Sequence, residues 1–284
     1  MEFVALDAGQ FMADGGALFG VVPKALWEKR YKCDENNMCL LSLRCLLVKV
    51  DDRVILIETG VGNKLDEKYL NNNGTSSFPN IFTALDEKGI SANEITDVVL
   101  THLHWDHVGG ATRIDDETGK VVPSFPNAKY WVSKTQWDHA HNANYREKSV
   151  YFPDNYYPLL DEGLLEFIES DSFIHPKIQL RHFNGHTPGQ LIPFIETSAG
   201  TVIYSSDMIP TAMHMPIPWV AAYDSYPVTV YEEKEKLLKE IAGKDYFLFF
   251  EHDYYTEMAS VKWDRKHPEV NEQLTLVDFQ NRMR

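Results

Sequence analysis

The sequence has few cysteines, no long apolar run and no N-terminal targeting pattern, and each absence excludes a class of protein. An odd number of cysteines, Cys33, Cys39 and Cys45, argues against a disulfide framework. No apolar run reaches the roughly 20 residues that span a bilayer, and the first residues lack the basic and apolar segments of a signal peptide. We therefore expect a cytoplasmic protein with no membrane partner.

Basic residues are also scarce. Lys and Arg number 27 against 42 Asp and Glu, which gives a formal net charge of −15. The resulting field repels phosphate backbones and anionic lipid surfaces, so a nucleic-acid partner is not expected. Acidity also keeps a protein soluble, so the charge excludes partners better than it identifies them.

Apolar runs of strand length alternate with helical patterns along the chain. The expected strands are 3–6, 43–50, 54–58, 95–101, 129–132, 178–183, 191–196, 202–204 and 246–250. Helices are expected at 79–88, 134–142 and 230–242. Strands interleaved with helices predict an α/β protein.

No repeat or long flexible linker divides the chain, and a hydrophobic content of 44% is enough for a substantial core. The candidate ligands described below are spread from residue 102 to residue 252, so a site that uses them needs most of the chain. We therefore predict a single domain spanning 1–284, with turn-rich loops at 71–78 and 208–227.

Four potential metal ligands crowd into six positions directly after the apolar run 95–100. They are His102, His104, Asp106 and His107, in the segment THLHWDHVGG. Buried together, such polar groups would cost roughly 1–3 kcal/mol for each one left unsatisfied. Coordination of a metal ion removes that cost, so the segment predicts a metal site.

Three later segments each end an apolar strand with a polar ligand. His186 stands in NGHTPGQ, Asp207 ends SSD, and His252 stands in EHD. In α/β proteins, catalytic groups collect on loops at strand ends, because the sheet holds them rigidly while the loop exposes them. Each segment therefore contributes one candidate ligand.

The motifs THLHWDHVGG, NGHTPGQ, SSD and EHD, in this order, resemble the successive ligand motifs of the metallo-β-lactamase superfamily. The resemblance implies an αβ/βα sandwich of two mixed β-sheets flanked by helices, with a two-metal site at one edge. It implies a first metal on His102, His104 and His186, and a second on Asp106, His107 and His252. Asp207 would bridge the two.

These donors also agree with the chemistry of a hydrolase. Five histidines and two aspartates without thiolate suit two divalent ions, zinc first, with manganese, iron or cobalt as alternatives. Bound metal lowers the pKa of water from ~15.7 toward ~7, which supplies hydroxide at neutral pH. We predict a dinuclear metal-dependent hydrolase in which Asp106 or Asp207 moves the proton. A single metal or a redox iron site remains an alternative.

Segments 14–24, 207–211 and 219–224 resemble the quorum-quenching N-acyl homoserine lactonase branch and its methyl parathion hydrolase-like relatives. The resemblance implies that a metal-bridging hydroxide opens the lactone ring. The loop after Asp207 is rich in Met, which adapts to an acyl chain. The substrate-binding residues expected there are Met208, Met213, His214, Met215, Trp219 and Tyr223.

Two positions depart from the relatives. Lactonases carry a Tyr three residues after the bridging Asp, where this chain has Pro210, and we nominate Tyr223 as its catalytic substitute. Gln190 stands where GHTPGH-type relatives have His, which alters the groups around the ligands.

Other activities share these motifs. The alternatives are a phosphotriesterase, a glyoxalase II-like thioesterase and, in a different class, a mononuclear-iron oxygenase of the same fold. The expected partner is a small-molecule ester or lactone. Because related enzymes are often dimers, a homodimer is also considered, with contacts from Phe11, Met12, Phe19 and Trp27.

Overall fold

A computed structural model describes residues 1–75 and 79–284, which divide into two compact units. Unit 1 comprises Met1–Phe11 and Leu43–Ser170, and unit 2 comprises Met12–Ser42 and Asp171–Arg284. Two long strands, β1 (Glu2–Asp14) and β2 (Met38–Val50), have residues in both units. The single domain expected for 1–284 stays a prediction.

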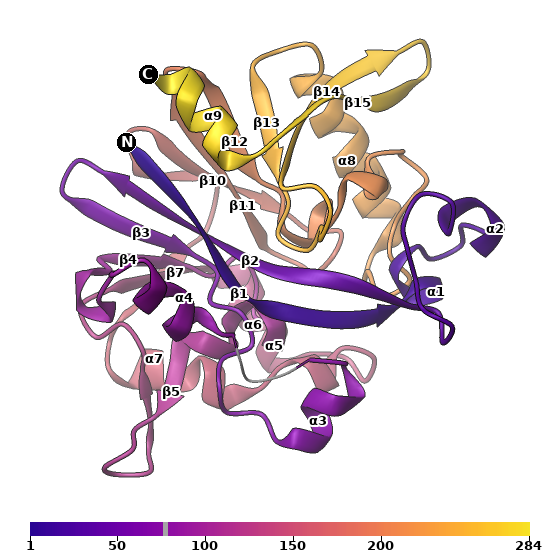
Figure 1. The fold of residues 1–284 in the computed structure, drawn as a ribbon. Helices are drawn as coiled ribbons and strands as arrows, with labels where there is room; N and C mark the ends of the chain where they lie inside the picture. The colour runs from indigo at the N-terminus through magenta and orange to yellow at the C-terminus, as the bar shows by residue number, and fades with distance from the viewer. Residues whose placement is uncertain (76–78) are drawn as a thin grey trace. The chain divides into compact units, whose positions relative to one another are not determined.

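Unit 1 is built on a six-stranded mixed sheet with the strand order β1-β2-β3-β4-β7-β8 (Figure 1). β2 and β3 are antiparallel to each other. The pairs β3–β4, β4–β7 and β7–β8 are parallel. A separate hairpin pairs β5 with β6. The bounds are β3 (Arg53–Ile57), β4 (Asp97–Val99), β5 (Thr112–Ile114), β6 (Val121–Pro123), β7 (Lys129–Ser133) and β8 (Leu165–Ile168).

Helices of unit 1 begin where the sequence supplies caps. Asn80 accepts the backbone N–H groups of Phe82 and Thr83 at the start of α4, and Ser133 accepts that of Gln136 at the start of α6. Apolar residues of α4 pack with β2, β4 and β7 in one buried cluster. The helices are α3 (Glu67–Asn72), α4 (Ile81–Glu87), α5 (Trp105–Val108), α6 (Lys134–His141) and α7 (Tyr157–Asp161).

Unit 2 is built on a seven-stranded sheet with the order β15-β14-β13-β12-β11-β10-β9. Only β12 and β13 are parallel among these neighbouring strands, so this sheet is also mixed. The bounds are β9 (Ser172–His175), β10 (Ile178–Phe183), β11 (Gln190–Thr197), β12 (Gly200–Tyr204), β13 (Tyr246–Phe249), β14 (Met258–Asp264) and β15 (His267–Leu274).

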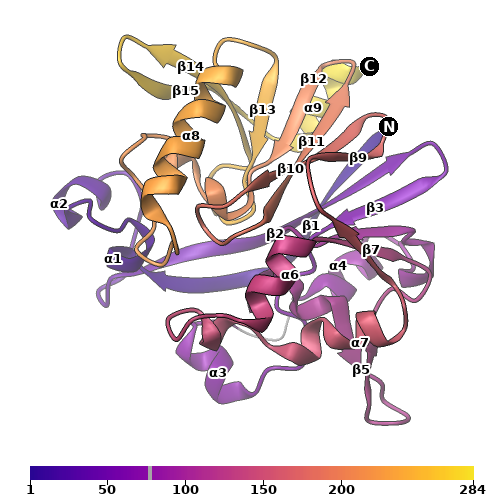
Figure 2. The same cartoon turned by 180° about the vertical axis from the view of Figure 1, so that it is seen from behind.

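The long helix of unit 2 is α8 (Pro227–Ile241), which packs against β14 (Figure 2). Leu237, Leu238 and Ile241 are buried, whereas Tyr231 is 41% exposed. The other helices are α1 (Gly15–Leu18), α2 (Lys24–Trp27) and α9 (Leu276–Met283).

A buried lysine joins α8 to the loop that follows Asp207. The Lys234 ammonium donates to the backbone carbonyls of His214, Pro216 and Trp219 at 2.9, 3.3 and 2.5 Å. Burial lowers the pKa of Lys234 to about 7. The helix therefore fixes the course of the loop through three hydrogen bonds from one side chain.

Two large mixed sheets with flanking helices confirm the predicted α/β class. The expected loop 208–227 contains the short turns η5 (Ser206–Met208) and η6 (Ala212–His214) and the start of α8. In the expected loop 71–78, residues 71–72 end α3 and 76–78 lie outside the described residues. Within the described ranges, no helix has the length and apolar character needed to cross a bilayer. A cytoplasmic location stays a prediction.

Candidate metal centre

The first group of predicted ligands lies in unit 1, directly after β4. His104 caps the short helix α5, which carries Asp106 and His107. The rings of His102 and His107 are fully buried, and Asp106 is nearly so. Unit 1 thus brings four predicted ligands together on one strand end and one helical turn.

Two ring nitrogens of this group point at each other. Nε2 of His102 lies 3.1 Å from Nδ1 of His104, while Nδ1 of His102 lies 3.0 Å from the hydroxyl of Thr101. Converging imidazole nitrogens are the arrangement that a divalent ion requires of its ligands. The donor set of unit 1 therefore fits a metal ion.

Glu58, a buried carboxylate beside this group, was not among the residues predicted from the sequence. It follows β3 with a φ of +65°, a region that favours glycine. One oxygen accepts the Thr101 N–H at 2.8 Å, and the other lies 3.8 Å from Nδ1 of His107. Glu58, His102 and His107 each offer an atom within 4.8 Å of the others. The signal was present, because Glu58 ends an apolar strand as the predicted ligands do.

The two glycines after His107 allow a close approach of two backbone segments. A Cβ atom at Gly109 would overlap the carbonyl oxygen of Val61, and one at Gly110 would overlap that of Thr59. Lys64 donates to the carbonyls of Gly109 and Thr112, and burial lowers its pKa to about 7. The chain is therefore anchored directly after α5, the helix that carries Asp106 and His107.

The second group of predicted ligands lies in unit 2, around Asp207. Its two carboxylate oxygens face different histidines. One oxygen lies 3.1 Å from Nε2 of His186, and the other lies 3.0 Å from Nε2 of His252. Asp207 thus lies between two of the predicted histidine ligands, with one oxygen toward each.

The other ring nitrogen of each of these histidines is held by a neighbour. Nδ1 of His186 lies 2.9 Å from the Asp224 carboxylate, and Nδ1 of His252 lies 2.9 Å from the Ser42 carbonyl oxygen. These acceptors require a proton on Nδ1, which leaves the Nε2 lone pair for a metal. Asp224 ends the segment 219–224 noted in the sequence, but its position beside His186 was not predicted.

The loop that carries His186 is fixed by α8. Glu233 of that helix accepts the backbone N–H groups of Asn184 and Gly185 at 2.9 to 3.1 Å. Gln190, the position that departs from GHTPGH-type relatives, is buried and donates to the Ser206 hydroxyl at 3.1 Å. It thus supports the residue next to Asp207, which agrees with the role outside the ligand set expected for it.

The predicted substrate-binding residues of unit 2 fall into different environments. Met213, Met215 and Trp219 line a cavity, whereas Met208 is buried in the apolar core of the unit. Tyr223 is 36% exposed, and its ring centroid lies 6.0 Å from that of His186 in an edge-to-face arrangement. Tyr223 is therefore the predicted substrate residue placed beside a predicted ligand.

His214 is enclosed by protein groups. Nδ1 lies 2.8 Å from the Thr211 hydroxyl, Nε2 lies 2.8 Å from the Leu18 carbonyl, and the ring stacks on Phe19. Burial lowers the pKa of His214 to about 3, so the ring is neutral. Both nitrogens face the protein, which gives His214 the geometry of a loop support; its substrate contact stays a prediction.

Two residues nominated for dimer contacts are interior. Phe19 and Trp27 are almost fully buried in unit 2, with ring centroids 5.2 Å apart. Buried side chains cannot reach a second copy of the chain, so these two residues are not available as the contacts considered for a dimer. The homodimer itself stays a prediction.

Comparisons with known proteins agree with these motifs. Residues 43–252 match the family described as the metallo-β-lactamase superfamily. An N-acyl homoserine lactonase of Bacillus thuringiensis is 26% identical over 241 residues, covering 77% of this chain and 84% of that protein.

Solved structures give the same result for the fold. A probable metal-dependent hydrolase from Staphylococcus aureus aligns with a TM-score of 0.85 and 30% identity over 96% of both chains. AidC, a dizinc quorum-quenching lactonase, aligns with a TM-score of 0.79 and 22% identity, covering 96% of this chain and 95% of that one.

Proposed function

Because the chain belongs to the metallo-β-lactamase superfamily and is a metal-dependent hydrolase, we propose that it opens the lactone ring of N-acyl homoserine lactones. The family match and the lactonase relatives confirm the resemblance and the fold class predicted from the motifs. A lactone substrate is a more specific proposal than a metal-dependent hydrolase, and the lactonase relatives support it.

We propose that two divalent ions, with zinc as the first choice, are held by seven side chains. These are His102, His104, Asp106, His107, His186, Asp207 and His252. The observation that carries this proposal is Asp207, whose two oxygens face Nε2 of His186 and of His252 at 3.1 and 3.0 Å. When bound, such ions lower the pKa of water and polarise a carbonyl group.

The chain's own residues would orient the ligands and handle the proton. Asp224 and the Ser42 carbonyl keep the Nδ1 protons of His186 and His252, so their Nε2 atoms face Asp207. Asp106 or Asp207 is proposed to accept the proton released on attack and to pass it to the leaving oxygen.

Tyr223 is proposed to hold the lactone carbonyl in place of the Tyr that Pro210 replaces. Its exposure and its position against the His186 ring support that role. The other predicted substrate-binding residues are proposed to face the acyl chain. They are Met208, Met213, His214, Met215 and Trp219.

The test is proton release when metal-loaded protein meets N-decanoyl homoserine lactone, because ring opening liberates a carboxylic acid. We expect kcat/KM of about 10⁴ M⁻¹s⁻¹ or higher, and loss of turnover in His102→Ala. Turnover of a thioester or a phosphotriester without turnover of the lactone would replace the proposed substrate and leave the hydrolase assignment intact. One bound iron per chain and no hydrolysis would instead favour the oxygenase.

A further inference from the structure

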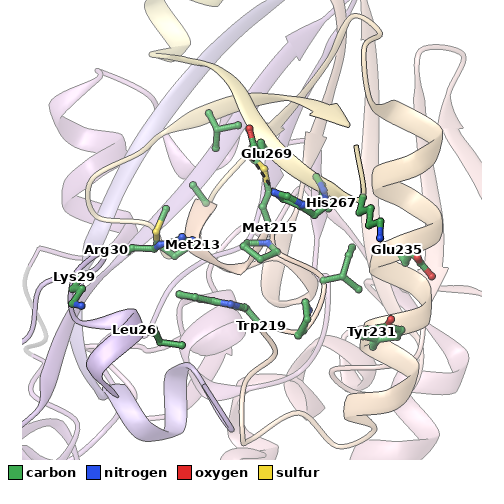
Figure 3. A pocket seen from close by; sticks show the side chains of 17 residues that line it. Leu26, Lys29, Arg30, Met213, Met215, Trp219, Tyr231, Glu235, His267 and Glu269 are labelled. Atoms are coloured by element: carbon green, nitrogen blue, oxygen red, sulfur yellow. Dashed lines mark hydrogen bonds and ion pairs between the residues drawn. The ribbon is translucent and has the colours of Figure 1, made fainter. Parts of the chain in front are cut away.

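We propose that a cavity in unit 2 binds an amphipathic carboxylate, a free fatty acid, through an apolar floor and a cationic edge. Its volume is about 810 Å³, within the range of small-molecule sites. The lining comes from α2 and the residues after it, from loop 212–219, from α8, and from the turn between β14 and β15 and the start of β15 (Figure 3). None of the seven predicted metal ligands lines it. Met213, Met215 and Trp219 are also proposed to face the acyl chain of the lactone, so binding of a free fatty acid is tested separately from hydrolysis.

The floor of the cavity is suited to an alkyl chain. Met213, Met215, Ile217 and Trp219 supply one side of it, and Leu26, which is 54% exposed, faces them from α2 (Figure 3). Methionine side chains adapt to irregular apolar ligands. An exposed leucine at the mouth of an apolar cavity gains contact when a ligand covers it.

The floor is fixed before any ligand arrives. Loop 214–219 is tied to α8 by the three hydrogen bonds from Lys234, and His214 is tied to Leu18 and Thr211. A wall that is already ordered loses less conformational freedom on binding. The cavity is therefore preorganised.

The edge of the cavity carries an excess of positive charge. Lys29, Arg30 and Lys266 line it, and neither lysine has an ion-pair partner within the described part of the chain. The Arg30 guanidinium lies 5.3 Å from the Trp219 ring centroid, which brings the charge to the apolar floor.

The acidic residues of the lining each lie beside a basic side chain. Glu235 pairs with Lys239 at 2.9 Å, and Glu269 lies 3.1 Å from His267 and 3.7 Å from Lys262. In a chain with a net charge of −15, this edge therefore favours an anion. Arginine presents a planar pair of donors that matches a carboxylate. An apolar floor next to such an edge selects an alkyl carboxylate over an amine or a neutral lipid.

Isothermal titration calorimetry of the full-length protein with decanoate, octanoate and 1-decanol tests the proposal. Each buried methylene is worth about fourfold in affinity, so decanoate should bind about fifteenfold more tightly than octanoate. The double variant Arg30→Gln/Lys266→Gln should bind decanoate about tenfold more weakly. Lys236→Gln, on the exposed side of α8, is the matched control and should bind like the parent.

His186→Ala separates this site from the predicted metal ligands. The proposal requires that the variant keeps decanoate binding while it loses hydrolysis. Binding that disappears in His186→Ala and persists in the Arg30/Lys266 variant would place the carboxylate on a metal and overturn the proposal. Three other results would also overturn the proposal. They are equal affinity for decanoate and 1-decanol, no binding of either acid, and sedimentation with phosphatidylglycerol vesicles without binding of free decanoate.

Discussion

His182 and His186 each lie beside an aspartate, and the burial of that aspartate differs between the two. Nδ1 of His186 lies 2.9 Å from Asp224, and both side chains are almost fully buried. Nδ1 of His182 lies 3.3 Å from Asp171, whose side chain is 54% exposed. The chemical pair is the same, but only the buried aspartate can hold a ring rigidly against a third group.

This contrast gives a matched pair of substitutions. Asp224→Asn keeps the size of the side chain and removes the charge that orients His186, so metal affinity should fall about 10- to 100-fold. Asp171→Asn should leave it unchanged. Metal content after dialysis against increasing chelator concentrations measures both. Equal retention in the two variants would show that Asp224 has no orienting role.

At the scale of elements, α8 serves two loops at once. Glu233 binds the loop that carries His186, and the adjacent Lys234 binds the carbonyls of loop 214–219. Lys234 occupies a buried position that an amphipathic pattern would fill with an apolar residue. Its interior position follows from the acceptors of a loop distant in sequence, so periodicity could not predict it.

The buried lysine also makes stability depend on pH. The pKa of Lys234 is lowered to about 7 in the folded state, so between pH 7 and about 10 the unfolded chain binds more protons than the folded one. The free energy of unfolding should therefore rise with pH across this window, by up to about 1.4 kcal/mol per unit. Lys234→Met should be less stable, because three carbonyls lose a donor. Its rise with pH should be smaller than that of the parent, since Lys64, whose pKa burial also lowers to about 7, still contributes.

Urea unfolding at pH 7, 8 and 9 measures the difference, with Lys239→Met as the control on the exposed side of the same helix. The control should show the same pH dependence as the parent. The same pH dependence of the free energy of unfolding in the parent and in Lys234→Met would contradict the prediction. It would mean that the Lys234 ammonium stays charged in the folded state, because the three carbonyls replace its hydration.

The elements that the sequence predicted share a strong local signal. β10 (Ile178–Phe183) has the predicted bounds, and α6 and α8 were located within a few residues, because apolar side chains recur there at the period of the element. β14 and β15 were missed, since their partly exposed faces carry charged residues such as Lys262 and Glu269. The motifs identified the candidate ligands. Glu58 ends an apolar strand as they do but was not chosen, and the contact of Asp224 with His186 became visible only when the chain was folded.

At the scale of the whole molecule, ligands are proposed in both units. Four come from unit 1 and three from unit 2. Metal binding to the folded chain should therefore stabilise residues of both units, by about 2.7 kcal/mol when the free ion is at 100 times its Kd.

Scanning calorimetry with and without chelator tests this expectation. Chelation should lower the melting temperature, and re-addition of zinc should restore it. Hydrogen exchange should show the loss of protection in α5 and around η5 alike. A melting temperature that does not respond to chelation, or protection lost in one unit alone, would contradict a shared ligand set.

The path of the chain through the two units has a consequence for its synthesis. Residues 12–42 belong to unit 2, yet 43–170 are translated before the rest of that unit. Domains generally fold as units while the ribosome adds about 5–20 residues per second. Unit 1 can therefore be complete on the ribosome while Phe19, Trp27 and Tyr31, which are buried in the finished protein, still wait for their later partners. We expect the nascent chain to expose these aromatic rings until the residues of 171–284 that complete unit 2 have been translated.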